Sequence, residues 1–146
     1  LNINICNMLP QTFVTAACLY INRYEKFVRI ARAGHPSIII QKADGNVVEY
    51  MPQGKALGLK TDNRYETLNY AVSSGDKILI YTDGIVEAMD INKNMFGIER
   101  LMEILKITQE ASCAESIETI YSELIHFVGD ASALEDDVTL IMIRIE

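Results

Sequence analysis

Three aspartates stand next to strand-like segments and could together hold a metal ion. Asp83 directly follows the apolar segment Lys77–Thr82, and Asp136 and Asp137 come just before the apolar segment Val138–Ile145. If the two segments are antiparallel neighbours in a sheet, the end of the first lies beside the start of the second, and the acids meet at one rim. Clustered carboxylates repel one another unless a cation lies between them. Mg²⁺ or Mn²⁺ suits a set of carboxylate and water ligands.

The same residues also fit simpler interpretations. An Asp-Gly pair after a strand, here Asp83-Gly84, is more often a turn than a ligand. An acidic pair before a strand is often part of a solvated loop. Spacing alone leaves both interpretations open.

Other reactive side chains give weaker signals. His35 lies between a glycine and a proline, where a lone histidine is more often a turn residue than a general acid. His126 falls at the end of a predicted helix, where we expect either a plain surface residue or one that compensates the helix dipole. Glu87 follows Asp83 by one helical turn and could support a metal site indirectly, although a solvent-facing acid is the simpler interpretation.

Two familiar patterns fail in detail. The segment Asp90–Leu101 superficially suggests a calcium loop, but Met95 stands where glycine is needed and Leu101 where glutamate is needed. The Thr-Asp-Gly sequence that contains Asp83 lacks the second aspartate used by haloacid-dehalogenase phosphatases. No Ser-His-Asp or Cys-His arrangement of a protein nucleophile is recognisable.

The composition describes one globular domain with an acidic balance. The chain has 146 residues, of which 49% are hydrophobic and 23% charged, and its formal net charge is −7. This charge disfavours nucleic-acid partners, and no apolar stretch approaches the roughly 18 residues of a membrane helix. Lys55, Lys60 and Arg64 could bind a phosphoprotein, although isolated basic side chains are usually just solvated.

The cysteines and the first residues carry expectations about location and processing. Cys6, Cys18 and Cys113 are odd in number and far apart, so we expect free thiols in a reducing cytoplasm rather than disulfides or a zinc cluster. Leu1–Pro10 lacks the basic region and cleavage site of a signal peptide. Because the chain does not begin with Met, we expect a processed or excised piece.

The order of elements predicts an α+β fold with antiparallel sheets. Helical spacing after Gly97 indicates one helix, and the capping-box pattern Ser112–Glu115 opens a second that should end at Gly129. The pair Asp44-Gly45 marks a hairpin turn, and regular βαβ alternation is absent. Alternating or β-branched segments predict strands over residues 13–21, 27–33, 37–41, 47–48, 65–72, 77–82 and 138–145.

Five short motifs occur in a fixed order from about Phe13 to Ile145. In that order they resemble the PPM-type metal-dependent serine/threonine phosphatases of the stage II sporulation protein E and sigma-factor-regulator class. Each motif alone is weak, whereas the ordered set is specific. The motifs are Ala33-Gly34-His35-Pro36, Gly54-x-x-Leu57-Gly58, Gly75-Asp76 with Tyr81-Thr82-Asp83-Gly84-Ile85-x-Glu87-Ala88, Phe96-Gly97-x-Glu99-Arg100-Leu101, and Asp136-Asp137-Val138-Thr139-Leu140.

This resemblance implies a fold, a cofactor and a reaction. The fold is an α-β-β-α sandwich of two packed antiparallel sheets with outer helices, and the cofactor is a pair of Mn²⁺ or Mg²⁺ ions. A metal-activated water attacks phosphoserine or phosphothreonine, so no protein nucleophile is needed. By position, Asp83 matches the metal ligand of the Thr-Asp-Gly motif and Asp136 the first aspartate of the closing motif. Asp137 ranks behind Asp136 as an adjacent candidate ligand.

One motif of the resembled family is missing. Its domains open with Asp-x-x-Gly-His-Gly, and no Gly-His-Gly occurs in this sequence. We therefore expect residues 1–146 to form a single, incomplete phosphatase domain that begins inside the fold, near Gln11–Asn22. Such a piece should bind divalent metal weakly, have little or no activity alone, and self-associate through an uncovered sheet edge or apolar face.

Two functions follow as alternatives. The first is a cytoplasmic protein phosphatase that acts on a phosphorylated regulatory protein, by family analogy an anti-sigma-factor antagonist, in bacterial signalling. The second is a degenerate phosphatase fold that serves as a binding or regulatory module without catalysis. A plain metal-stabilised β-sandwich would bind ions without turnover.

Overall fold

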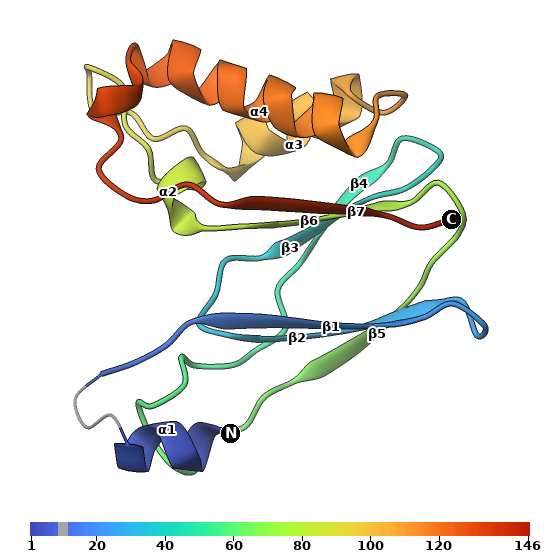
Figure 1. The fold of residues 1–146 in the computed structure, drawn as a ribbon, viewed down its shortest axis with the longest axis vertical. Helices are drawn as coiled ribbons and strands as arrows, with labels where there is room; N and C mark the ends of the chain where they lie inside the picture. Colours follow the sequence, from blue (N-terminus) through green and yellow to red (C-terminus); the bar gives the residue numbers. More distant parts are fainter. Residues whose placement is uncertain (9–11) are drawn as a thin grey trace. The chain divides into compact units, whose positions relative to one another are not determined.

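A computed structural model describes residues 1–8 and 12–146 as two compact units (Figure 1). Unit 1 consists of residues 1–37 and 50–72, and unit 2 of residues 38–49 and 73–146. Gln11, near which we expected the chain to enter the fold, lies outside the described residues.

Unit 1 contains a three-stranded antiparallel sheet. The strand order is β1-β2-β5, so the central β2 pairs with a neighbour on each side. Val28 and Ile30 of β2 are fully buried, as expected for alternate positions of a central strand. The elements of this unit are α1 (Asn2–Met8), β1 (Ala16–Asn22), β2 (Phe27–Ala33) and β5 (Thr67–Ala71).

The first strand begins later than predicted. Phe13 is exposed, and Val14 pairs instead with Leu57 through two main-chain hydrogen bonds of 2.9 and 2.8 Å. Period-two hydrophobicity identifies β-capable residues but does not say which segment they pair with, so this isolated bridge could not be separated from the strand that follows.

Unit 2 contains a four-stranded antiparallel sheet in the order β4-β3-β6-β7. The predicted hairpin turn at Asp44-Gly45 is confirmed: the Lys42 N–H donates to the Asn46 carbonyl oxygen at 2.7 Å, and this turn connects β3 to β4. Ile78 and Leu79 of β6 are both buried, so the strand is covered on both faces as its sequence predicted. The strands are β3 (Ile38–Gln41), β4 (Val47–Tyr50), β6 (Lys77–Tyr81) and β7 (Leu140–Arg144).

Two long helices pack beside this sheet (Figure 1). Their apolar stripes enter one core with the sheet, including Leu101 and Leu105 from the first helix and Ile120 and Leu124 from the second. The second helix has the predicted capping box at Ser112. The helices of unit 2 are α2 (Asp83–Val86), α3 (Ile98–Ile107), α4 (Cys113–Val128) and the short 3₁₀ turn η1 (Ala131–Ala133).

A buried lysine connects the sheet to the end of α3. Lys77 is only 2% exposed, and its Nζ donates to the carbonyl oxygens of Thr108 and Gln109 at 3.0 and 2.9 Å. These carbonyls follow the last turn of α3, where acceptors lack intrahelical partners. No local pattern in the sequence indicates that this charged side chain is buried.

The observed architecture is the predicted α+β class, with two antiparallel sheets and helices. No helix within residues 1–8 and 12–146 is both long and apolar enough to cross a membrane.

Candidate metal centre

The pairing of β6 with β7 brings the two acidic segments together. Tyr81 is opposite Leu140 in this antiparallel pair, and the Thr82 N–H donates to the Thr139 carbonyl oxygen at 3.1 Å. Asp83 begins α2 two residues beyond β6, and Asp136 lies four residues before β7. The strands are therefore antiparallel neighbours, which was the condition for the acids to meet, and the acidic segments come to the same end of the sheet.

The Thr82 side chain fixes the backbone between the two segments. Its hydroxyl donates to the Asp137 carbonyl oxygen at 2.9 Å and accepts from the Thr139 N–H at 2.9 Å. Thr82 occupies the N-cap position of α2, yet its side chain makes no capping hydrogen bond. The hydroxyl bridges to the neighbouring segment instead of closing its own helix.

Gly84 permits this close approach. A β-carbon at this position would lie 2.6 Å from the Asp137 carbonyl oxygen and 3.4 Å from the main-chain carbon of Asp136. The first distance is far shorter than normal van der Waals contact, and the obstacle is backbone, which cannot rotate away. The glycine after Asp83 is therefore needed for packing against the second acidic segment, and not only for a turn.

The Asp136 carboxylate is partly held and still open to solvent. Its Oδ1 accepts from the Asp137 N–H at 2.7 Å. Asp83, Asp136 and Asp137 are all exposed, and in the described part of the chain none of the three forms an ion pair with Lys or Arg. Carboxylates gathered at one edge without a basic partner leave oxygen atoms free for a cation.

A cleft of about 820 Å³ opens beside these residues. Asp136 and Gly84 line it, together with Glu87, Glu135 and Lys93, whereas Asp83 and Asp137 are not among the lining residues. The charged side chains of the wall are therefore mainly acidic, with one basic side chain, Lys93, among them.

Asp90 also lines the cleft and was not predicted as part of it. Its Oδ1 accepts from the main-chain N–H groups of Asn92 and Asn94, and its Oδ2 accepts from the Asn94 amide. These hydrogen bonds, led by that from the Asn94 side chain, lower the pKa of Asp90. The segment that failed as a calcium loop is thus a turn built on Asp90. Only the fold reveals that it faces the cleft.

The carboxylates of Asp83, Asp136 and Asp137 are the type of ligand that a hard divalent cation prefers, but they are too few to complete its coordination. Carboxylate oxygens without basic partners are the ligands that Mg²⁺ and Mn²⁺ prefer. Within the described residues, however, no three or more His, Cys, Asp or Glu side chains are arranged so that they could hold a metal ion. The described residues by themselves therefore do not form a complete metal site.

The remaining sequence candidates lie in different places. Glu87 ends α2, and its N–H donates to the Asp83 carbonyl oxygen at 2.9 Å, so it is joined to the candidate ligand through the backbone. His126 is in the last turn of α4. His35 belongs to unit 1, where the Arg32 Nη1 donates to its carbonyl oxygen at 2.6 Å.

The chain is similar to known bacterial proteins over most or all of its length. The whole chain, residues 1–146, matches the family described as stage II sporulation protein E (SpoIIE). It is 31% identical over 111 residues to Protein IcfG of Synechocystis, covering 76% of the chain and 17% of that protein. It is 26% identical over 142 residues to phosphoserine phosphatase RsbU of Bacillus subtilis, covering 94% and 41%. The chain spans less than half the length of either relative.

Solved structures share the fold. The SiaA-PP2C domain of Pseudomonas aeruginosa matches with a TM-score of 0.87 at 20% identity, over 99% of this chain and 58% of that one. The manganese-presoaked phosphatase domain of SpoIIE from Bacillus subtilis matches with a TM-score of 0.70 at 17% identity, over 90% and 56%. The two sheets and their helices are thus those of a PP2C phosphatase domain.

Proposed function

Because the chain belongs to the stage II sporulation protein E family, we propose that it forms part of a phosphatase domain that hydrolyses phosphoserine or phosphothreonine on a regulatory protein. It is homologous to PP2C-type serine phosphatases such as RsbU. One observation supports the proposal most strongly: the pairing of β6 with β7 brings the segment of Asp83 beside that of Asp136 and Asp137.

Asp83 and Asp136 are the proposed metal ligands, with Asp137 as the weaker candidate. The Asp137 backbone is already engaged on both sides, since its carbonyl accepts from Thr82 and its N–H donates to Asp136. Its main contribution is therefore to orient the Asp136 carboxylate. The solved SpoIIE domain was presoaked with manganese. We propose that Mn²⁺ or Mg²⁺ is also the cofactor of this chain.

The chemistry divides between the ions and the chain. When bound, the ions supply a water of lowered pKa and offset charge on the phosphoryl oxygens. The carboxylates of Asp83 and Asp136 hold them, and the Thr82 hydroxyl keeps the two carboxylate segments at a fixed separation. The open cleft beside Asp136 admits the phosphorylated segment, and Lys93 on its wall supplies a positive charge near the phosphate.

The proposal treats residues 1–146 as an incomplete domain. The opening motif Asp-x-x-Gly-His-Gly of the resembled family does not occur in the sequence. The chain also covers only 58% and 56% of the two solved phosphatase domains. In this proposal the missing metal ligands come from residues that the 146 do not include, so these residues alone turn over little or no substrate.

The test uses the natural protein in which these 146 residues occur. Its Mn²⁺-dependent release of phosphate from phosphoserine and phosphothreonine proteins is measured, with an anti-sigma-factor antagonist among the substrates. Asp83→Asn and Asp136→Asn should each lower the rate at least a hundredfold, whereas Glu118→Gln, at an exposed position of α4, should not. Equal activity in all four proteins would contradict the assignment.

A second function, a binding or regulatory module without catalysis, is favoured by the incomplete donor set of the described residues. It predicts that the natural protein binds the phosphorylated regulatory protein but releases no phosphate with Mn²⁺ or Mg²⁺. The same assay therefore decides between the two functions.

Location and self-association complete the proposal. Three widely spaced cysteines, all free thiols, suit a reducing cytoplasm.

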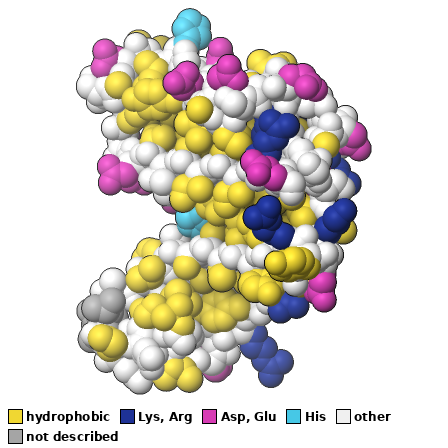
Figure 2. All heavy atoms as spheres, turned by 45° about the vertical axis from the view of Figure 1, so that its right-hand side comes forward, with side chains coloured by type: hydrophobic (Ala, Val, Ile, Leu, Met, Phe, Trp, Pro, Cys, Tyr) yellow, Lys and Arg dark blue, Asp and Glu magenta, His cyan; other side chains and the backbone are white. Residues whose placement is uncertain are grey.

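In unit 1, hydrophobic side chains of Leu1, Ile3, Met8 and Phe13 are exposed, and Figure 2 shows hydrophobic side chains over the lower part of the surface. Such a surface favours association between copies. Sedimentation at rising concentration should show dimers or larger species, and a strictly monomeric profile would refute this part.

A further inference from the structure

The two units carry opposite charge. Unit 1 has seven Lys and Arg against three Asp and Glu, a net charge of +4, and unit 2 has six against seventeen, a net charge of −11. Although the net charge of the whole chain is negative, unit 1 is therefore basic. The candidate metal ligands all lie in unit 2, which is acidic.

Four of the seven basic side chains of unit 1 line one pocket of about 480 Å³. They are Arg32, Lys55, Lys60 and Arg64, and Asp62 is the only acid on the same wall. None of these four forms an ion pair within residues 1–8 and 12–146. Cations that converge on a pocket without counter-charges raise the local concentration of anions.

The loop that carries three of these side chains is held firmly. The Gly34 N–H donates to the Gly54 carbonyl oxygen at 2.7 Å. A β-carbon on Gly54 would lie 2.1 Å from the Arg32 carbonyl oxygen, so this part of the loop lies directly on β2. At its other turn, the Asn2 amide donates to the Lys60 carbonyl oxygen at 2.7 Å and accepts from the Gly58 N–H at 3.0 Å. The backbone that carries these cations is thus held in place without a ligand.

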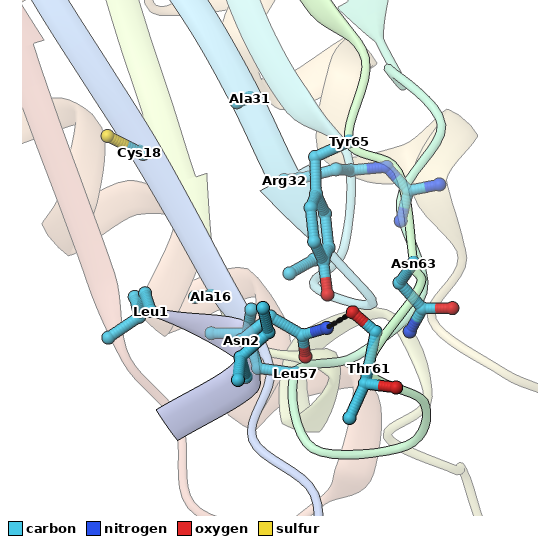
Figure 3. Close-up of a pocket in the computed structure, with 12 residues that line it drawn as sticks. Leu1, Asn2, Ala16, Cys18, Ala31, Arg32, Leu57, Thr61, Asn63 and Tyr65 are labelled. Carbon is cyan, nitrogen blue, oxygen red and sulfur yellow. Dashed lines mark hydrogen bonds between the residues drawn. The ribbon is translucent and has the colours of Figure 1, made fainter. Parts of the chain in front are cut away.

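Two polar groups at this pocket lack acceptors. The Arg32 Nε and the Asn63 Nδ2 are buried and find no hydrogen-bond partner in the part of the chain that the structure describes. Figure 3 shows the Arg32 side chain extending from β2 towards the segment of Asn63, where the basic pocket and a neighbouring apolar one meet. Buried donors without acceptors call for a bound ion or water.

We propose that this pocket of unit 1 binds a phosphate group. A phosphate carries a charge of about −1.5 to −2 at neutral pH and three strong acceptor oxygens, which matches a wall of four cations and additional N–H donors. A carboxylate has one charge and would leave most of these groups unmatched. Arginine N–H groups suit the geometry of phosphate oxygens, and the Nε of Arg32 is without a partner among the described residues, whereas its Nη1 donates to the His35 carbonyl oxygen.

The proposal does not depend on the metal centre. None of the lining residues is a proposed metal ligand, and the pocket is formed entirely by residues of unit 1. The ligand can be free inorganic phosphate or the phosphoryl group of a phosphorylated polypeptide, since both present the same chemistry.

The experiment titrates the metal-free 146-residue chain, in excess chelator at constant ionic strength, with three ligands. These are inorganic phosphate, a phosphoserine peptide and the same peptide without phosphate, and binding is followed by calorimetry and by amide NMR shifts. Lys60→Gln with Arg64→Gln should weaken phosphate binding at least tenfold, because it removes two charged donors. Arg23→Gln with Lys26→Gln removes the same charge from unit 1 outside the pocket and should change binding less than twofold.

Saturable phosphate binding with shifts at residues 53–64, weakened only by the pocket pair, supports the site. The two peptides then identify the source of the phosphate group. Binding of the phosphopeptide but not of the unphosphorylated peptide points to a polypeptide ligand. Binding of inorganic phosphate but not of the phosphopeptide points to free phosphate. Absence of saturable binding by both phosphate ligands, or equal weakening by the two variant pairs, would overturn the proposal. Because metal is absent throughout, the result is separate from the fate of the phosphatase proposal.

Discussion

The Thr82 hydroxyl donates a hydrogen bond of 2.9 Å to the main-chain carbonyl oxygen of Asp137. These residues are 55 positions apart in sequence, and the bond joins the two segments that carry the candidate metal ligands. The same hydroxyl accepts from the Thr139 N–H. One small side chain thus sets the spacing between two acidic segments, and its removal is a sensitive test of the site.

Thr82→Val should weaken both stability and metal binding. Valine keeps the shape of the side chain but removes the hydroxyl, so one donor and one acceptor lose their partner, at a cost of about 1 kcal/mol. Chemical denaturation measures the stability, and Mn²⁺ titration measures the affinity. Thr82→Ser retains the hydroxyl and should preserve most of the Mn²⁺ affinity. If valine and serine variants bind Mn²⁺ equally, the bridge does not position the acids.

Gly84→Ala should displace the segment of Asp136 and Asp137. The added methyl would lie 2.6 Å from the Asp137 carbonyl oxygen, and relieving such a clash costs about 1–3 kcal/mol. We expect a lower melting temperature together with reduced Mn²⁺ binding. Gly129→Ala is the control, because Gly129 has φ 91° and no atom within 4 Å of the added methyl. It should cost stability through conformation alone and leave Mn²⁺ binding intact, and the prediction fails if both variants affect the metal equally.

The capping box of α4 should make stability depend on pH. The Ser112 N–H donates to the Glu115 carboxylate at 2.7 Å, and this bond, the largest cause, lowers the pKa of Glu115. A carboxyl whose pKa is lowered by folding stabilises the protein above its unfolded-state pKa and loses that contribution as pH falls through the folded-state value. The advantage of the natural protein over Glu115→Gln should therefore be full near pH 7 and shrink in acid.

Urea denaturation from pH 3 to pH 7 measures this advantage. Glu118→Gln, an exposed position on the same helix, is the control and should show a smaller dependence on pH. Ser112→Ala removes the reciprocal bond and should cost about 1 kcal/mol at neutral pH. An advantage of Glu115 that stays constant across this range would contradict the assigned pKa shift.

Local signals in the sequence predicted much of the fold. Asp44-Gly45, Ser112–Glu115, the alternation of β2 and the continuous apolar run of β6 specify their own conformations through neighbouring residues, and these expectations are confirmed. The condition on which the meeting of the acids depended, that β6 and β7 are antiparallel neighbours, is met. Because that pairing brings the acids to one edge, the position of the candidate site was accessible from the sequence.

Features that depend on residues far apart in the chain could not be predicted from the sequence. The last strand was expected from Val138, but the Thr139 N–H bonds to the Thr82 hydroxyl, and β7 begins at Leu140. The burial of Lys77 depends on carbonyls more than thirty residues away. The place of Asp90 on the cleft wall likewise follows from tertiary packing and from no local pattern.

The most direct test of the metal site is Mn²⁺ binding to the 146-residue chain, measured by calorimetry and by the loss of free-ion signal in electron paramagnetic resonance. We predict weak binding, reduced about tenfold or more by Asp83→Asn or by Asp136→Asn, less by Asp137→Asn, and unchanged by Asp62→Asn. Affinity that is the same in Asp83→Asn and Asp136→Asn as in the natural sequence would contradict the assignment of these carboxylates as ligands. Tight binding of two ions would contradict the incomplete site.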